Sequence, residues 1–284
     1  MRRRRRLGQA FETLEVRNLL TGFSAFNGLF SSSATGENTT FYSDVGGRDS
    51  AGPLIDSETG EATDVLLSTA QVGVHFGGNG AQPAPGTDAH DIFDGAVDFS
   101  AGGERSIEIG PGDAYQYTFE NLDSGATYDF AGTAIRGNAG YTDRWTLVEI
   151  QGAVSATPAH SSGSGVVTSG LPDNQVAIWT GHNAAGNQGY VAHWMDIDPG
   201  ADGIFHVVST QYTGSVPTSI NSSGRASGSK GYGLSGVRLI ENIPAGPPAV
   251  DNVGATSIMA FEATVAGRIA TTGGEIPEVT VYYG

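Results

Sequence analysis

The sequence predicts an all-β chain in which residues 25–242 form a two-sheet β-sandwich of the jelly-roll type. Short runs of alternating apolar and polar residues fill this range, as in strands that bury one face. The 43 glycines gather in turn-forming clusters such as Pro111-Gly112-Asp113, which suit tight turns. No segment beyond the first 22 residues keeps a helical apolar period over three turns. About a dozen strands are therefore expected, enough for a sandwich or jelly roll.

Residues 1–24 form a basic leader that we expect to be disordered or a short helix. Arg2 to Arg6 are an unbroken basic run. A secretory signal peptide needs about 7–15 apolar residues after such a run. Charged residues, Glu12, Glu15 and Arg17, interrupt the apolar stretches here, so a basic amphipathic helix at a disordered terminus is one interpretation.

The segment Leu14-Glu15-Val16-Arg17-Asn18-Leu19-Leu20 resembles the LEPR-XLL leader of large exported proteins, mostly from planctomycete bacteria. Val16 stands in place of the usual proline. The resemblance implies export or surface display, and therefore an extracellular or cell-surface location.

The clearest strand patterns lie in the middle of the chain. Tyr115, Tyr117 and Phe119 alternate with polar neighbours, which predicts a strand with one buried face. Apolar residues occupy both parities over 145–150, so we expect that strand to be buried on both faces. Further strands are predicted over 63–68, 71–76, 107–109, 176–179, 190–195, 205–208 and 234–240. We favour one domain, the alternative being two smaller sandwiches divided near residues 152–169.

Leu122 lies six residues before Tyr128, across the turn Asp123-Ser124-Gly125. This arrangement resembles the tyrosine corner of fibronectin-III-like sandwiches. In that corner the tyrosine hydroxyl bonds to the backbone upstream and pins the crossover between the two sheets. The resemblance implies a structural role for Tyr128.

A Pro-rich linker is predicted over residues 243–249, and residues 250–284 follow it. The last residues, TGGEIPEVTVYYG, resemble the opening strands of fibronectin-III-like modules that repeat in large bacterial surface proteins. Residues 250–284 are too few for a complete module of about 100 residues. We therefore expect an incomplete module, in a fragment of a longer product or with a poorly ordered end.

Charge and cysteine content exclude several functions. The net charge is −16. The leader holds six of the 14 basic and two of the 30 acidic residues, so the remainder has 8 basic and 28 acidic residues and a charge of −20. Such a chain repels phosphate backbones, which argues against nucleic-acid binding. The absence of cysteine excludes disulfides and thiolate ligands, and no apolar run is long enough to predict a transmembrane segment.

Several segments resemble an uncharacterised jelly-roll module of bacterial extracellular multidomain proteins, similar to galactose-binding-like domains. They are residues 136–145, 176–179, 189–194, 196–203 and 231–241. The resemblance implies adhesion or glycan binding.

One loop-to-strand segment carries the candidate ligand-binding residues Arg136, Asn138, Tyr141, Asp143 and Arg144. Sugar rings stack on exposed aromatic faces, and charged or amide side chains bond to their hydroxyls. These residues therefore predict a rim for a glycan or a surface protein. Further aromatic candidates for stacking are Tyr190, Trp145, Trp179 and Trp194. The alternative is that the three tryptophans fill the core, which we favour for Trp179 and Trp194 because apolar strand residues flank them.

Asp196, Asp198 and Asp202 predict a structural calcium site, because alternate carboxylates on a turn supply the oxygen ligands that calcium prefers. Their spacing departs from the EF-hand loop, and a polar hairpin turn is the alternative. Another acidic loop is predicted at Asp88, Asp91 and Asp94.

No catalytic motif is present. The six histidines form neither H-x-x-x-H nor H-E-x-x-H, and no G-x-S-x-G elbow occurs. The sequence therefore predicts a non-enzymatic module for adhesion or carbohydrate binding within a larger exported protein. A purely structural spacer is the first alternative. The second is a glycan-processing hydrolase, which would need two carboxylates about 5–10 Å apart.

Overall fold

A computed structural model describes residues 22–29, 36–45, 49–100, 105–137, 140–181, 189–244, 249–259 and 262–271. The leader up to Thr21 and the TGGEIPEVTVYYG segment lie outside these residues. The chain divides into two compact units, and Gly22–Pro244 is the larger. The described part of the other unit is one antiparallel pair, β16 (Ala249–Met259) with β17 (Glu262–Thr271).

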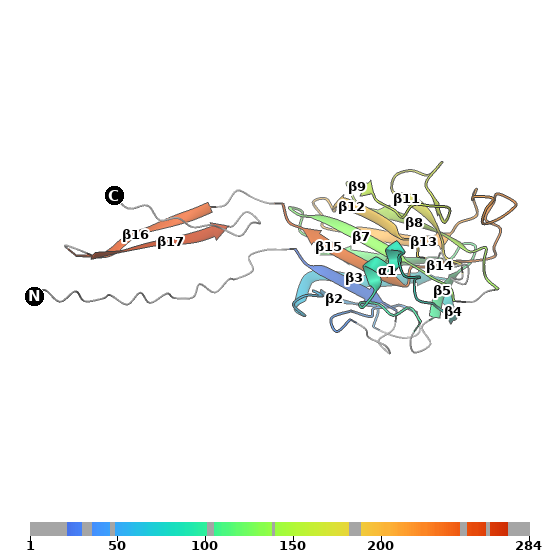
Figure 1. Ribbon diagram of the computed structural model, residues 1–284, viewed down its shortest axis with the longest axis horizontal. Helices are drawn as coiled ribbons and strands as arrows, with labels where there is room; N and C mark the ends of the chain where they lie inside the picture. The colour runs from blue at the N-terminus through green and yellow to red at the C-terminus, as the bar shows by residue number, and fades with distance from the viewer. Residues whose placement is uncertain are drawn as a thin grey trace, which may run out of the picture. The chain divides into compact units, whose positions relative to one another are not determined.

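Eight strands of the larger unit form a jelly roll (Figure 1). They pair antiparallel as β1 with β15, β6 with β13, β7 with β12 and β8 with β11. These nested pairs alternate between two sheets, as in a long hairpin rolled into a sandwich. The predicted all-β, sandwich-like fold is confirmed. The bounds of the eight strands are β1 Ser24–Gly28, β6 Ala114–Glu120, β7 Thr127–Thr133, β8 Trp145–Gln151, β11 Gln175–Trp179, β12 Ala192–Asp198, β13 Phe205–Gln211 and β15 Gly236–Asn242.

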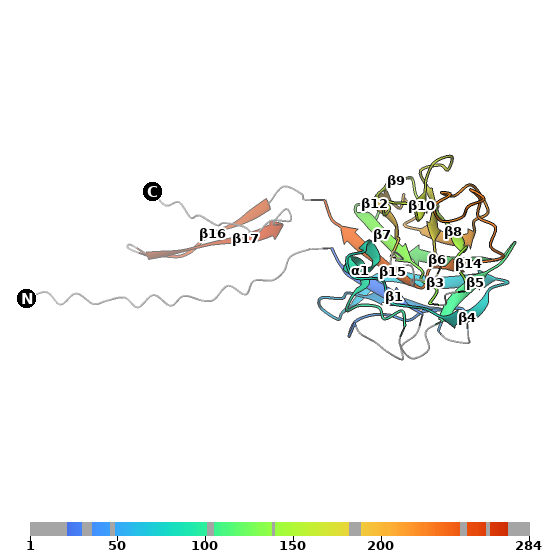
Figure 2. The same cartoon turned by 45° about the vertical axis from the view of Figure 1, so that its right-hand side comes forward.

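Shorter strands extend both sheets. The five-stranded sheet has the order β1-β15-β7-β12-β9, and the seven-stranded sheet has the order β10-β11-β8-β13-β6-β3-β2. A small sheet, β14-β5-β4, lies at one end of the sandwich (Figure 2). Strands from before and after residues 152–169 are neighbours in both large sheets, so these parts of the chain fold together. The added strands are β2 Ala51–Ile55, β3 Ala62–Val72, β4 His75–Asn79, β5 Arg105–Ile109, β9 Ser155–Pro158, β10 Val166–Val167 and β14 Gly231–Gly233.

Aromatic side chains fill the space between the two large sheets. Phe119 of β6 contacts Phe130 of β7 edge-on, with ring centroids 5.9 Å apart, and lies 5.0 Å from Phe205 of β13. The alternation predicted for β6 is confirmed, because its three aromatic residues are fully buried. The expected core positions of Trp179 and Trp194 are also confirmed, and Trp145 is buried as well.

Two strand predictions are wrong. Leu147 and Glu149 of β8 are only partly buried, because that face of the seven-stranded sheet is incompletely covered. The range 71–76 is not one strand, since β3 ends at Val72 and β4 begins at His75. Gly73 turns the chain between them with a φ of +70°, and a Cβ there would lie 2.1 Å from Asp113 Oδ1.

A short helix, α1 (Asp88–Phe93), replaces the expected acidic loop at Asp88, Asp91 and Asp94. Thr87 caps it by accepting a hydrogen bond from the backbone N–H of His90. Six residues are too few to show a helical period, so the sequence pattern missed it. Its buried side chains pack on the outer face of the five-stranded sheet, in a cluster of Ala89, Phe93, Val97, Phe99, Ala131 and Val191. Within the described ranges no helix has the length and apolarity needed to cross a membrane.

The predicted tyrosine corner is confirmed where the chain crosses from β6 to β7. The backbone N–H of Asp123 donates to the Tyr128 hydroxyl at 2.7 Å. That hydroxyl donates in turn to Glu241 Oε1 of β15 at 2.9 Å. Burial raises the pKa of Tyr128, which keeps its hydroxyl protonated as the donor. Burial also raises the pKa of Glu241, and the hydrogen bond from Tyr128 acts in the opposite direction.

We predict that Tyr128→Phe lowers the free energy of unfolding by about 1–3 kcal/mol, because it removes two hydrogen bonds and leaves polar groups unpaired. Urea unfolding followed by tryptophan fluorescence measures this loss. Tyr212→Phe is the matched control, since the Tyr212 hydroxyl only donates to Ser215 O on the surface. Equal stability of the two variants would contradict the structural role of Tyr128.

Candidate functional site

The outer face of the five-stranded sheet carries the polar residues of the candidate site. In β7, Tyr128 and Phe130 point into the core, so Asp129 and Ala131 point outward. The strand register places Arg238 of β15 and His193 of β12 on either side of Ala131. Because Ala131 is small, α1 can pack above it while the longer polar side chains remain beside the helix.

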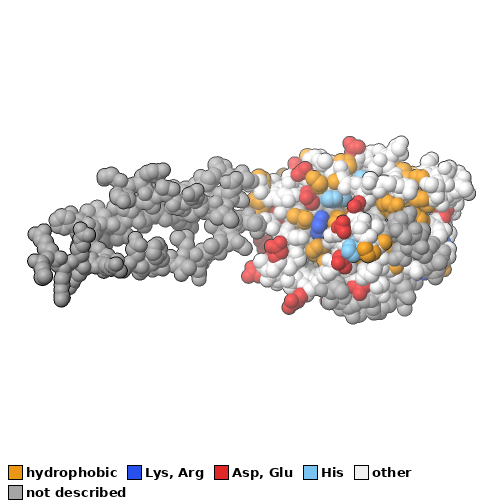
Figure 3. All heavy atoms as spheres, viewed as in Figure 1, with side chains coloured by type: hydrophobic (Ala, Val, Ile, Leu, Met, Phe, Trp, Pro, Cys, Tyr) orange, Lys and Arg blue, Asp and Glu red, His pale blue; other side chains and the backbone are white. Residues whose placement is uncertain are grey.

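A hollow of about 290 Å³ opens between α1 and the segments around β12. Figure 3 shows this face of the molecule, where histidine and acidic side chains gather around a basic one. The wall combines carboxylates, a hydroxyl, an imidazole and apolar groups. The lining residues are Asp88, Asp91, Ile92, Ala159, Ser161, Val191 and His193.

Backbone contacts hold α1 against the chain that leads into β12. The N–H of Ala89 donates to Gly189 O at 3.0 Å. Gly189 is required by this close approach, because a Cβ there would lie 2.1 Å from Thr87 Oγ1. On the opposite wall, Ser161 accepts a hydrogen bond from Val191 N–H at 2.9 Å. These contacts therefore fix the positions of the two walls of the hollow.

His193 contributes a nitrogen without a partner. One ring nitrogen is hydrogen-bonded to the backbone of Ala159, and Nε2 is buried with no partner among the described residues. Burial lowers the pKa of His193; Arg238 lowers it further, while Asp129 and Asp88 act in the opposite direction. The ring is therefore neutral at pH 7, and Nε2 is an acceptor.

Asp129 and Arg238 lie behind the hollow on the same face. Asp129 Oδ1 accepts hydrogen bonds from Asp196 N–H at 3.0 Å and Asn242 Nδ2 at 2.9 Å. Burial lowers the pKa of Arg238, and Asp129 offsets part of this effect. In the part of the chain that is described, Arg238 Nε is buried and has no hydrogen-bond partner.

The predicted ligand rim is a packed cluster. The guanidinium carbons of Arg136 and Arg144 lie 4.9 and 5.3 Å from the centre of the Tyr141 ring. Asp143 Oδ2 accepts hydrogen bonds from the backbone and hydroxyl of Ser227, both at 2.8 Å. These four predicted residues come together, but their charged and aromatic groups contact one another. Asn138 lies outside the described residues.

The three carboxylates predicted to bind calcium lie in a β-bulge and in the turn that follows it. Asp196 lies in a β-bulge of β12 with a φ of +51°, and Asp198 Oδ1 accepts the Gly200 N–H at 2.8 Å within the following turn. Asp202 is exposed in that turn. No group of three or more metal-ligating side chains occurs among the residues described, and the geometry matches the polar-turn alternative.

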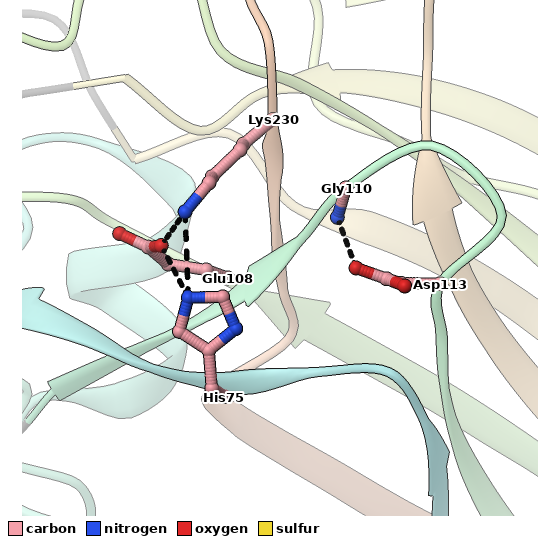
Figure 4. A network of polar contacts seen from close by, with 5 residues as sticks. All are labelled: His75, Glu108, Gly110, Asp113 and Lys230. Carbon is pink, nitrogen blue, oxygen red and sulfur yellow. Dashed lines mark hydrogen bonds and ion pairs between the residues drawn. The ribbon is translucent and has the colours of Figure 1, made fainter.

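A second polar cluster joins the strands of the small sheet (Figure 4). Glu108 of β5 contacts Lys230 and lies 2.9 Å from Nε2 of His75 on β4. Burial would raise the pKa of Glu108, but the contacts with Lys230 and His75 outweigh it and hold that pKa below its usual range. This cluster satisfies its own charges, so it ties the sheet together.

A larger hollow, of about 450 Å³, lies between the end of β8 and the start of β9. One of its two side-chain amides is bonded internally: Asn174 Nδ2 donates to Ile150 O at 3.0 Å. The backbone carbonyl of Asp173 accepts from Trp194 Nε1 at 2.9 Å. The hollow beside α1 differs from it in having two exposed carboxylates, Asp88 and Asp91, in its lining.

Sequence reasoning missed Ser161, His193 and Arg238 as site residues. A signal was present, because Asp129, His193 and Arg238 are charged or titratable residues at outward positions of apolar strands. Their assembly depends on strand pairings between distant parts of the chain, which the pattern of one strand does not contain.

We predict a pH-dependent loss of stability from His160. Burial and, second, the neighbouring His193 lower the pKa of His160 to about 4. As the pH falls, the unfolded chain therefore takes up a proton on this imidazole before the folded chain does. The resulting destabilisation is absent above about pH 6.5, and the free energy of unfolding falls as the pH drops towards 4, by roughly 1–3 kcal/mol after allowance for the partial exposure of the ring. His160→Asn keeps an acceptor for His193 N–H without the titration. Urea unfolding between pH 7 and 4.5 tests this; parallel curves for the variant and the wild type would contradict it.

No protein family, curated protein or solved structure matches this chain.

Proposed function

We propose that this chain is a non-enzymatic β-sandwich module that binds carbohydrate through the hollow beside α1. The observation that carries the proposal is a concave wall in which exposed carboxylates lie next to apolar side chains. Small-ligand sites combine polar groups with apolar surface. The volume of about 290 Å³ lies just below the range for such sites, about 300–1,000 Å³, and suits a single sugar ring of a longer glycan.

The lining supplies contacts that match a sugar. Ile92 and Val191 offer apolar surface for the C–H groups of a ring. Asp88 and Asp91 can accept hydrogen bonds from hydroxyl groups. We therefore propose the outer face of the five-stranded sheet as the glycan site, beside the earlier candidate residues 136–144.

A structural spacer is the second candidate, because the Arg136–Tyr141–Arg144 cluster is engaged in internal contacts. Export and an extracellular or surface location remain part of the proposal and rest on the resemblance of the leader. A spacer does not require a hollow lined by polar groups. The two candidates therefore differ in whether the hollow binds a glycan.

A glycan array followed by calorimetric titration tests the proposal. We expect at least one glycan to bind and the Ala159→Gln variant, which fills the hollow without changing a charge, to weaken binding at least tenfold, since the ligand can no longer enter. Ala201→Gln, on an exposed turn, is the matched control. Binding that survives Ala159→Gln would place the site elsewhere, and no binding to any glycan would favour the spacer.

A further inference from the structure

The side chains around the hollow beside α1 offer almost only hydrogen-bond acceptors. Asp88 and Asp91 each present a carboxylate, and Asp91 is 71% exposed at the open rim. His193 also lines the hollow, but its Nε2 is buried and its other ring nitrogen is bonded to the backbone of Ala159. Only Ser161, at 8% exposure, supplies a side-chain donor: its oxygen accepts from Val191 N–H, and its own O–H has no acceptor among the residues described.

The charged side chains of the wall favour the same kind of ligand as its hydrogen-bond acceptors do. Two carboxylates line the hollow, and neither a lysine nor an arginine lines it. His90 lies beside Asp91, with Nδ1 3.5 Å from Oδ1, but on α1 outside the lining. Arg238 lies on the same face as His193, across Ala131, and is also outside the lining. An acceptor-rich wall of negative charge favours a ligand that brings donors and a positive charge.

We infer that the hollow selects a sugar bearing a primary ammonium group, that is, an amino sugar whose nitrogen is not acetylated. The inference rests on the carbohydrate-binding function proposed above and names the class of sugar. An ammonium group carries three N–H donors and no acceptor, and these donors can be shared between the carboxylates of Asp88 and Asp91. Ser161 can then donate to a ring or hydroxyl oxygen.

A matched pair of ligands tests the inference: a glucosamine trisaccharide and its fully N-acetylated counterpart, titrated calorimetrically at pH 6. We expect the amine form to bind about tenfold more tightly, because two partly exposed carboxylates each contribute a modest charge interaction. Asp88→Asn with Asp91→Asn should reduce this preference to about twofold or less. Both positions are exposed, so the variant is expected to fold, and thermal melting verifies this.

Asp202→Asn is the control, since it removes one negative charge from an exposed turn that does not line the hollow. It should leave the preference for the amine unchanged. Equal binding of both trisaccharides, with both lost in Ala159→Gln, would overturn the amine selectivity and leave carbohydrate binding intact. A preference that survives in the double variant would also overturn it. Absence of binding by either trisaccharide and by the glycan array would overturn both proposals.

Discussion

The crossover from β6 to β7 sets the geometry on which the rest of the sandwich depends. The Tyr128 hydroxyl joins Asp123 in the turn to Glu241 in β15, so one group fixes the turn, β7 and its neighbour together. A slip of one residue in β7 would exchange the faces of Phe130 and Ala131. The core would then receive an acidic side chain, and α1 would lose the small residue on which it packs. Core and outer face therefore depend on the same register.

The outer face differs from the other polar regions in being hollowed beside α1. Around Glu108 the charged groups contact one another, and around Tyr141 two guanidinium groups lie against the ring. Beside α1, the exposed carboxylates of Asp88 and Asp91 line the hollow together with apolar side chains. This combination is the reason for proposing the hollow as the binding site.

The sequence predicted those elements whose pattern lies within a few consecutive residues. The alternation of Tyr115, Tyr117 and Phe119 and the spacing from Leu122 to Tyr128 each depend on residues close together in the chain, and both were predicted correctly. The helix α1 was missed because six residues show no period, although Thr87 is a good capping residue. The hollow could not be predicted, because His193 and Ser161 meet Asp88 only after the nested strands have paired.

The pairing of β1 with β15 has a mechanical consequence. Ser24 lies opposite Ile240 and Gly28 opposite Gly236, so the chain enters and leaves the sandwich at the same end. Tension transmitted through the flanking segments would pull these two strands apart one hydrogen bond at a time. It would not load all their hydrogen bonds in parallel, as it does when strands are sheared lengthwise. Such an unzipping geometry yields at low force.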